Sequence, residues 1–290
     1  MKEIVNRLAE AGEKLIIGER SAHLRHELPS RDRCIQIVEV LRSVLFPGYF
    51  GTSELSRDSL RYHIGANLDW ASQALKEQVL RGLCSICKKH DPSQCPECHE
   101  RANGIVDSFV TKLPDVGRVL MTDADAAYKG DPAATSREEA IFSYPGLLAI
   151  TNQRLAHELN KLGVPLIPRI ITEHAHSITG IDIHPGAKID EEFFIDHGTG
   201  VVIGETCVIG KRVRIYQGVT LGAKSFPLDE RGNPIKGIER HPIIEDDVII
   251  YAGATILGRI RIGKGSVIGG NVWITSDLPA GSRISQVEAR

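Results

Sequence analysis

The sequence predicts an α+β fold, in which an all-helical N-terminal domain over residues 1–180 precedes a parallel β-helix over residues 181–290. Two observations support this expectation. In the first half, apolar residues recur at spacings of three, four or seven, as they do on the buried face of a helix. In the second half, isoleucine or leucine recurs every six residues, a period that an α-helix cannot keep on one face.

The helical domain contains several amphipathic segments that need partners to bury their apolar faces. The expected helices cover residues 34–46, 57–83, 100–113, 116–128 and 147–162. The first stops at Pro47-Gly48, and the last ends at Gly163 before Pro165, as helices commonly do. We therefore expect these helices to pack together and to contribute to oligomerisation.

The second half repeats a hexad whose first position is apolar. That position holds Ile183, Ile189, Ile195, Ile203, Ile209, Ile215, Leu221, Ile244, Ile250, Ile256, Ile262, Ile268 and Ile274. A small or apolar residue follows four positions later, as at Ala187, Phe193, Thr199 and Cys207. In a parallel β-helix each hexad supplies one short strand and one corner, so both positions are expected to face the inside of a prism.

This pattern resembles the hexapeptide-repeat acyltransferases, which fold as left-handed β-helices, and the handedness is taken from that resemblance. The repeat is interrupted twice, and function is expected where a scaffold departs from its own rule. Eight residues replace six between Ile195 and Ile203, where Asp196-His197 occurs. A longer polar insertion, residues 223–242, must leave the prism as a loop and ends near Arg240-His241.

Transfer of an acyl group to an alcohol needs few parts, and the interrupted coils offer them. A base must take the hydroxyl proton, and histidine, with an unperturbed pKa of about 6.5, suits this task. A carboxylate should hold the imidazole in one tautomer, and an arginine can bind a substrate carboxylate through two hydrogen bonds. An Asp-His pair in a loop is by itself usually a solvated turn. Two histidine–charge pairs at the two interruptions of one ladder instead favour an active site.

The motifs DIHPGAKI, DHGTGVVIGET, YQGVTLGA and ERHP resemble, in order and spacing, the signature of the serine acetyltransferases. The likeness continues upstream through SYPGLLAI, GDPAA and VLFPGYFG, so that it covers nearly the whole chain. The resemblance implies a serine O-acetyltransferase, which moves an acetyl group from its co-substrate acetyl-CoA to the hydroxyl of L-serine. This reaction is the first step of cysteine biosynthesis.

The resemblance also implies a role for each matching residue. His197 corresponds to the general base and Asp182 to its orienting carboxylate. The residues that correspond to substrate-binding positions are Asp131, Asp196, Glu205, Arg240 and His241. Among them, Arg240 would hold the carboxylate of serine, while Asp131 and Asp196 would hold its amino group.

CoA in this family lies in a groove between neighbouring β-helices. The positions that match its backbone contacts are Ala223, Ala252, Gly253 and Gly270. The resemblance further implies a homotrimer or a dimer of trimers, with active sites between subunits. The chain ends at SQVEAR, without the tail that docks O-acetylserine sulfhydrylase in relatives, so docking by that route is not expected.

The family transfers the acetyl group directly, without an acetyl-enzyme. An acetyl-enzyme would need a nucleophilic side chain, and Cys207 is the one cysteine near these motifs. Cys207 occupies an inward position of its hexad, so it is interpreted as a small core residue. The histidines of EHAHS, His174 and His176, are interpreted without a metal because the family resemblance accounts for them.

A separate motif lies between two expected helices. Cys84 and Cys87 form one C-x-x-C pair, and Cys95 and Cys98 form a second. Paired C-x-x-C motifs in a reducing compartment often bind zinc through four thiolates, so a structural zinc ion is one interpretation. A loop with incidental cysteines and a redox switch are the alternatives.

Other functions stay open at this point. An acetyltransferase acting on a sugar or another amino alcohol would share His197 but would not need acids and an arginine placed around a zwitterion. A γ-type carbonic anhydrase would need three histidines across coils, and the histidines here do not fall at such hexad positions. A scaffold without catalysis would not need intact DH, GET and RH motifs.

Composition narrows the setting. The chain has 35 basic and 37 acidic residues and no long block of like charge, which argues against nucleic-acid and anionic-membrane partners. No apolar run reaches the roughly 18 residues that span a bilayer. The N-terminal segment MKEIVNRLAEAGEKL lacks the apolar centre of a signal peptide. A cytoplasmic location is therefore expected.

Overall fold

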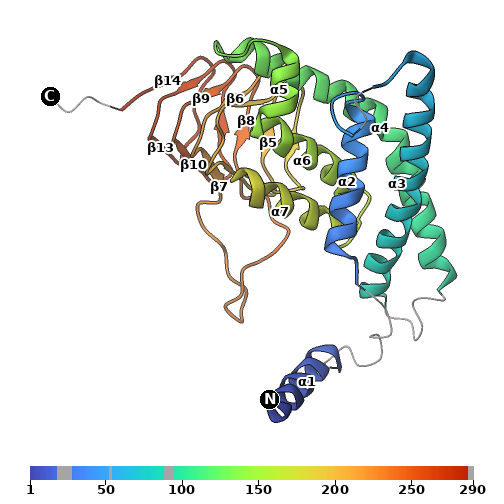
Figure 1. Cartoon of the computed structure of the whole chain (residues 1–290). Coiled ribbons are helices and arrows are strands. Elements are labelled where there is room, and N and C mark those ends of the chain that lie inside the picture. The colour runs from blue at the N-terminus through green and yellow to red at the C-terminus, as the bar shows by residue number, and fades with distance from the viewer. Residues whose placement is uncertain (18–27, 52–53, 88–94, 287–290) are drawn as a thin grey trace.

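The computed structural model describes residues 1–17, 28–51, 54–87 and 95–286. Figure 1 shows the helices of the first half followed by a prism of stacked coils. The helices are α1 (Lys2–Ile17), α2 (Arg31–Leu45), α3 (Arg57–Ile86), α4 (Pro96–Gly130), α5 (Arg137–Ser143), α6 (Pro145–Lys161) and α7 (Ile167–Thr179). None of the described helices is long and apolar enough to cross a membrane.

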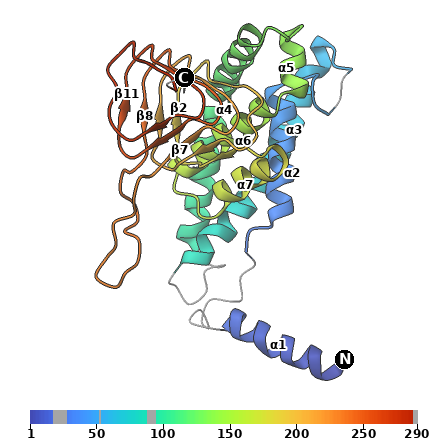
Figure 2. The ribbon, with the colours of Figure 1, turned by 90° about the vertical axis from the view of Figure 1, so that its left-hand side faces the viewer.

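The prism consists of three parallel sheets, and Figure 2 shows its coils nearly end-on. One sheet contains β1 (Asp182–Ile183), β4 (Val202–Ile203), β7 (Thr220–Gly222), β10 (Thr255–Leu257) and β13 (Trp273–Ile274). The second contains β2 (Lys188–Ile189), β5 (Val208–Ile209), β8 (Ile243–Ile244) and β11 (Arg261–Ile262). The third contains β3 (Phe194–Ile195), β6 (Arg214–Ile215), β9 (Ile249–Ile250), β12 (Val267–Ile268) and β14 (Arg283–Ile284).

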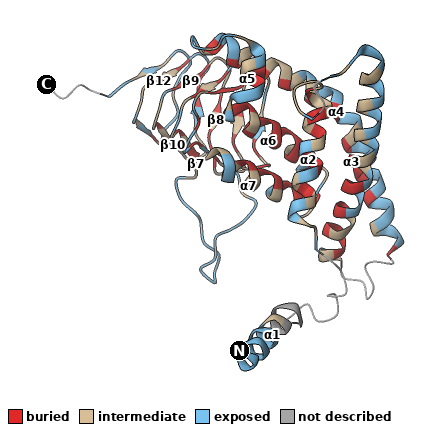
Figure 3. Cartoon of the chain, in the orientation of Figure 1, coloured by how far each residue is buried: buried red, intermediate tan, exposed pale blue. Residues whose placement is uncertain are grey.

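The six-residue period is confirmed by the strand register. In the first sheet, Ile203 pairs with Ile183 on one side and Leu221 on the other, and all three side chains are buried. The same register joins the isoleucines of the other two sheets. Stacked isoleucines thus form the interior of the prism, which Figure 3 shows as a buried centre under exposed corners.

The expected inward position of Thr199 is wrong, because its side chain is exposed. The short interruption adds two residues to its corner, which shifts the alternation of inward and outward side chains. Val201, which is fully buried, takes the inward place before Ile203. His197, Thr199 and Gly200 are thereby left exposed at the corner, while Gly198 between them is buried.

The expectation of two helices over residues 100–113 and 116–128 is also wrong, because α4 is continuous and contains Pro114. A proline inside a helix removes one backbone hydrogen bond and costs about 3 kcal/mol. The buried face of α4 nevertheless keeps its period across Pro114, from Phe109 and Leu113 to Val116 and Leu120. Tertiary packing of this face stabilises the helix through the proline.

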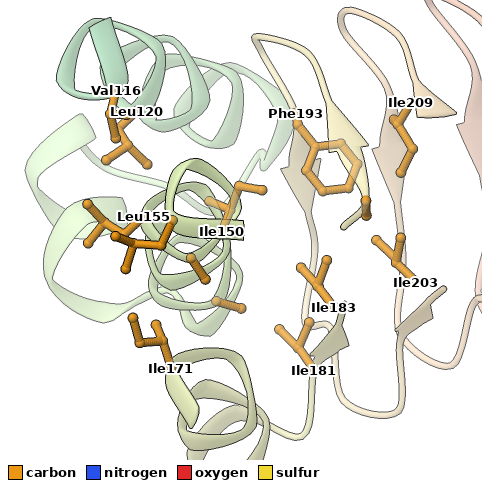
Figure 4. Packing of buried hydrophobic residues seen from close by; sticks show 14 of the residues in the cluster. Val116, Leu120, Ile150, Leu155, Ile171, Ile181, Ile183, Phe193, Ile203 and Ile209 are labelled. Atoms are coloured by element: carbon orange, nitrogen blue, oxygen red, sulfur yellow. The ribbon is translucent and has the colours of Figure 1, made fainter. Parts of the chain in front are cut away.

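The open end of the first coil is covered by α6 and α7. Figure 4 shows Ile150 of α6 on the side that faces Ile181 and Ile183, with Leu155 and Ile171 behind it among the helices of the same buried cluster. The helices and the prism therefore share one hydrophobic core rather than two separate ones. This cap removes the unpaired edge that the first coil would otherwise expose.

The long insertion leaves the prism as predicted, and Figure 1 shows it hanging below β7. Its residues are largely exposed, including Phe226, Leu228 and Ile235. A single antiparallel bridge pairs Leu228 with Pro234. The C-terminal segment SQVEAR, to which the expectation about sulfhydrylase docking refers, includes residues 287–290, which lie outside the described residues.

Candidate active site

The short interruption presents His197 to solvent. It follows β3 at the corner where the chain passes to β4, and 72% of the His197 side chain is exposed. Its Nε2 lies 3.8 Å from Oδ1 of Asp196, whose side chain is 16% exposed. His197 has a φ of 56°, in the left-handed region, which is uncommon for a residue other than glycine and is often found at functional sites.

The helical half brings a second carboxylate to this corner. Asp131, directly after α4, accepts a hydrogen bond from the Tyr144 hydroxyl at 2.5 Å and one from the Ala133 N–H at 2.8 Å. These bonds, first that of Tyr144, lower the pKa of the Asp131 carboxyl, and the nearby His197 acts in the same direction. Asp131 is therefore ionised at neutral pH and lies within electrostatic reach of His197.

Glycines allow the helices to approach β3 this closely. A Cβ at Gly146, at the start of α6, would lie 2.4 Å from the carbonyl oxygen of Ile195. A Cβ at Gly130, at the end of α4, would lie 2.7 Å from the ring of Phe194. These contacts fix Asp131 and Tyr144 beside Asp196-His197. These four residues, Asp131, Tyr144, Asp196 and His197, are called the histidine-197 group.

The long insertion follows β7 and ends just before β8, at a different corner, between the first and second sheets. Arg240 Nη2 donates to Oε2 of Glu205 at 2.7 Å, and its Nη1 donates to the carbonyl of Ile238 at 3.2 Å. The carboxylate therefore fixes one side of the guanidinium, whose side chain remains 22% exposed. Arginine held in this way is well suited to bind a carboxylate of a ligand.

His241 is buried beside Arg240, in contrast to His197. Its ring lies against Gly204, where a Cβ would be 2.1 Å from the imidazole. The Thr206 N–H donates to Nδ1 of His241 at 3.0 Å, so the neutral ring carries its proton on Nε2. Burial, and then the charge of Arg240, lower the pKa of His241 to about 4. Glu205, Thr206, Arg240 and His241 are called the arginine-240 group.

The two groups lie at opposite ends of β4 in one chain. The histidine-197 group precedes this strand and the arginine-240 group follows it. At about 3.3 Å per extended residue, the distance from Gly200 to Glu205 is on the order of 15 Å. A single chain therefore does not bring the two groups together around one small molecule.

The predicted CoA contacts divide between the same two corners. Gly253 and Gly270 lie on neighbouring coils of the corner that carries His197, and the Ala252 carbonyl there accepts a hydrogen bond from the Asn271 N–H at 2.9 Å. Ala223 follows β7 at the other corner, where the Gly222 carbonyl accepts from the Gly258 N–H at 3.0 Å. The two sets flank the outer face of the β1–β4–β7–β10–β13 sheet.

Sequence similarity to known proteins assigns the chain to a family. Residues 241–276 match the family described as bacterial transferase hexapeptide (six repeats). A protein of Synechococcus elongatus named "Serine acetyltransferase, plasmid" is 53% identical over 295 residues, which cover 100% of this chain and 92% of that relative. The chain belongs to the serine acetyltransferase family.

Solved structures of serine acetyltransferases agree with this assignment. Serine acetyltransferase 1 of Entamoeba histolytica, in complex with L-cysteine, has a TM-score of 0.75 and 36% identity, over 94% of each chain. The enzyme of Neisseria gonorrhoeae, in complex with serine, has a TM-score of 0.56 and 25% identity, over 88% of this chain and 96% of that chain. The prism is accordingly the left-handed β-helix of hexapeptide repeats that the sequence resemblance implied.

Two further residues organise the site of this serine acetyltransferase family member. The Thr206 hydroxyl accepts hydrogen bonds from the N–H groups of Arg240 and His241, at 3.0 and 3.1 Å. The Arg259 guanidinium donates to the carbonyls of Thr206 and His241, at 2.7 and 3.0 Å. Thr206 belongs to the GET motif. The spacing of residues in the sequence does not predict its contact with Arg240-His241 at the end of the long loop.

Asp182 is not brought to His197 by a hydrogen bond or ion pair in this chain. One carboxylate oxygen of Asp182 lies within 4.8 Å of ligand atoms of Glu173 and His176. His176 Nδ1 is also 3.3 Å from Oε2 of Glu173. Among the described residues of this chain, the carboxylate that lies within 4 Å of the His197 ring is Asp196, on the same corner.

The cysteines of the sequence motifs in this serine acetyltransferase family member differ in their surroundings. Cys207 is fully buried inside the prism, and burial raises its pKa to about 12, so the thiol is poorly suited to act as a nucleophile. Cys87, Cys95 and Cys98 each place a sulfur within 4.8 Å of the other two. Cys84, the remaining member of the paired motifs, is buried one turn earlier on α3 and lies outside that group.

Proposed function

We propose that this chain is a serine O-acetyltransferase, which transfers the acetyl group of acetyl-CoA to the hydroxyl of L-serine and releases CoA and O-acetylserine. The observation that carries the proposal is the histidine-197 group. It combines an accessible imidazole with two carboxylates at an interrupted coil, in a chain that belongs to the serine acetyltransferase family. The product would begin cysteine biosynthesis.

His197 is the proposed general base. It would take the proton of the serine hydroxyl while the oxygen attacks the thioester carbonyl of acetyl-CoA. The tetrahedral intermediate then collapses, the carbon–sulfur bond breaks, and His197 returns the proton to the CoA thiolate. A positioned histidine contributes about 10²–10⁴-fold to such a reaction. Direct transfer fits the chain because Cys207, the cysteine in these motifs, is buried in the core.

The charges of the two groups suit the zwitterion of serine. Asp131 and Asp196 would bind the ammonium beside His197, where Tyr144 keeps Asp131 ionised. Arg240 would bind the carboxylate through the side of its guanidinium that Glu205 does not occupy. The neutral Nε2–H of His241 adds a donor without adding a second positive charge.

A complete site then requires two chains. The groups lie at opposite ends of β4, so a neighbouring subunit would place its arginine-240 group beside the histidine-197 group of the first. A homotrimer of prisms supplies this contact with closed symmetry. CoA would lie in the groove between prisms, against Ala252, Gly253 and Gly270 of one chain and Ala223 of the next. The helical half would join two such trimers.

Asp182 remains the proposed orienting carboxylate for His197. It would take this role in the assembled oligomer. Since acetyl-CoA is an intracellular metabolite, the proposal also places the enzyme in the cytoplasm. The cysteine cluster has no part in this reaction, because it lies at the far ends of α3 and α4 from Asp131.

An acetyltransferase acting on an amino sugar would share His197 but would leave Arg240 without a carboxylate to bind. CoA thiol release from acetyl-CoA, measured with L-serine, homoserine and an amino sugar, separates these functions. We expect release that depends on serine and falls by about 10²-fold or more in His197→Ala. His63→Ala, which removes a histidine from α3, should retain native activity. Release with the amino sugar but not with serine would refute the proposal.

A further inference from the structure

The paired cysteine motifs converge where α3 ends and α4 begins. Cys87 is the C-terminal cap of α3, and Cys95 is the N-terminal cap of α4. Each places its sulfur within 4.8 Å of the other and of Cys98, which lies in the first turn of α4. Three thiols from two helices thus face one point, although the reaction proposed above uses none of them.

The geometry is close to that of a tetrahedral metal site. Four thiolates at a Zn–S distance of about 2.3 Å lie roughly 3.8 Å from one another. The three sulfurs need to close by at most about 1 Å to reach that spacing, which side-chain rotation can supply. Both motifs also fold alike, since the N–H of the second cysteine donates to the carbonyl of the first, at 3.2 Å for Cys87 to Cys84 and 3.1 Å for Cys98 to Cys95.

The surroundings shield the cluster from water. Cys84 and Cys95 are 3% and 4% exposed, so bulk water has little access to that side of the group. Pro96 opens α4, and the N-terminal end of this helix carries partial positive charge that stabilises nearby thiolates. Cys84 lies in the last turn of α3 and its carbonyl accepts from the N–H of the cap residue Cys87, so both cysteines belong to the turn that ends the helix.

We propose that Cys84, Cys87, Cys95 and Cys98 bind one Zn²⁺ ion, which joins the end of α3 to the start of α4. Cys87, Cys95 and Cys98 supply the three converged thiolates, and Cys84 completes the tetrahedron from the preceding turn. Four sulfur ligands leave no open coordination position, so the ion stabilises structure and does not bind substrate. Thiolates favour Zn²⁺ over hard cations such as Mg²⁺.

The ion would act locally. Away from the cluster, α3 and α4 are already held by buried apolar side chains, among them Val79 and Leu83 of α3 and Ile105 and Phe109 of α4. The protein without zinc should therefore remain folded, while the helix ends at the cluster open more often. This makes the site testable without measuring acetyl transfer, so its failure would not bear on the proposed function.

Metal content of the full-length protein is the first test. The protein is purified without added chelator, and zinc and iron are measured by plasma mass spectrometry. We expect about one zinc per chain, and a loss of nearly all of it in Cys95→Ser and in Cys84→Ser. Cys34→Ala, which removes a buried thiol of α2 outside the cluster, is the matched control and should keep its zinc.

Two further measurements guard against loss of metal through misfolding. Cobalt added to the chelated native protein should give the intense visible bands of tetrahedral sulfur coordination. Chelation of the native protein should accelerate amide exchange in residues 80–87 and 95–101 by about tenfold or more, and leave the prism unchanged. Stoichiometric iron in place of zinc would refute the assignment. So would native protein that holds no metal, or whose cysteines are joined in a disulfide, as seen by a loss of mass. Zinc retained in Cys84→Ser would refute the four-cysteine set.

Discussion

The two interruptions of the prism carry histidines with opposite properties. His197, in the short interruption, is 72% exposed and has a backbone in the left-handed region. His241, after the long insertion, is 6% exposed, and its ring is held by Thr206 against Gly204. One side chain is free to meet a substrate and exchange a proton. The other is fixed in one tautomer and kept neutral.

This difference shows how one repeat can support both proton transfer and substrate recognition. Two extra residues at a corner leave the chain outside the prism, where a base can reach a substrate and where α4 and α6 can add Asp131 and Tyr144. The long loop instead returns to the prism, and its last residues pack against the coil. There the N–H groups of Arg240 and His241 donate to the Thr206 hydroxyl, which positions both residues. The first corner supplies chemistry, and the second supplies rigid recognition.

The largest effects on kcat/KM are expected from variants that test which group of serine each corner binds, the carboxylate at Arg240 or the ammonium at Asp131. Arg240→Gln should lower kcat/KM for serine by about 10²-fold, the scale of one or two charged hydrogen bonds. With ethanolamine, which has no carboxylate, the same variant should differ little from the native enzyme. Asp131→Asn should show the reverse preference, with a large loss for serine and little loss for 3-hydroxypropanoate, which has no ammonium. Equal losses with all acceptors in both variants would contradict the division of roles.

A smaller effect is expected at Thr206. Thr206→Val keeps the shape of the side chain but removes the hydroxyl that accepts from the N–H groups of Arg240 and His241. Each lost hydrogen bond costs about 1 kcal/mol, so KM for serine should rise several-fold to tenfold with a smaller change in kcat. Thr206→Ser retains the hydroxyl and should restore KM. A fall in kcat alone would rule out a positioning role for the hydroxyl. So would a KM in Thr206→Ser that stays as high as in Thr206→Val.

The smallest effect concerns stability and pH. The folded pKa of His241 is about 4, below the unfolded value of about 6.5, so the unfolded chain takes up a proton that the folded chain refuses. Stability should therefore decrease as pH falls from about 6.5 towards 4. The lowered pKa values of His157 and His184 act in the same direction.

His241→Asn removes one of these groups while its amide oxygen can still accept from the Thr206 N–H. The decrease in Tm between pH 7 and pH 5 should be smaller in this variant than in the native protein. An identical decrease in both proteins would show that His241 does not resist protonation in the folded state.

The sequence predicts the prism well because the six-residue spacing that specifies it can be recognised within a short segment. Every sixth residue faces the same interior, so Ile203 and Ile250 can be placed without knowing their neighbours. The same rule fails for Thr199, since two extra residues change which side chains face inward. It also fails at Pro114, where packing of α4 against other helices outweighs a local signal to stop.

The site is harder to predict from sequence, because its contacts are not local. The hydroxyl of Tyr144 meets Asp131 across 13 residues, and Thr206 meets His241 across 35. Sequence motifs identify His197 and Arg240 as candidates. They give no sign that one chain holds the two at opposite ends of β4, or that Cys87, Cys95 and Cys98 converge while Cys84 stays a turn away.

Mixing two inactive variants tests most directly whether the two corners complete one site between subunits. His197→Ala and Arg240→Ala chains are co-expressed with different tags, and the mixed oligomers are isolated and assayed for serine-dependent CoA release. In a trimer that contains both variants, about a third of the interfaces (one of the three) pair an intact histidine-197 group with an intact arginine-240 group. The account predicts recovery of about that share of native activity. It predicts none when His197→Ala is mixed with Asp131→Asn, since both changes damage the same corner. Mixed oligomers of His197→Ala and Arg240→Ala that remain inactive would contradict the account.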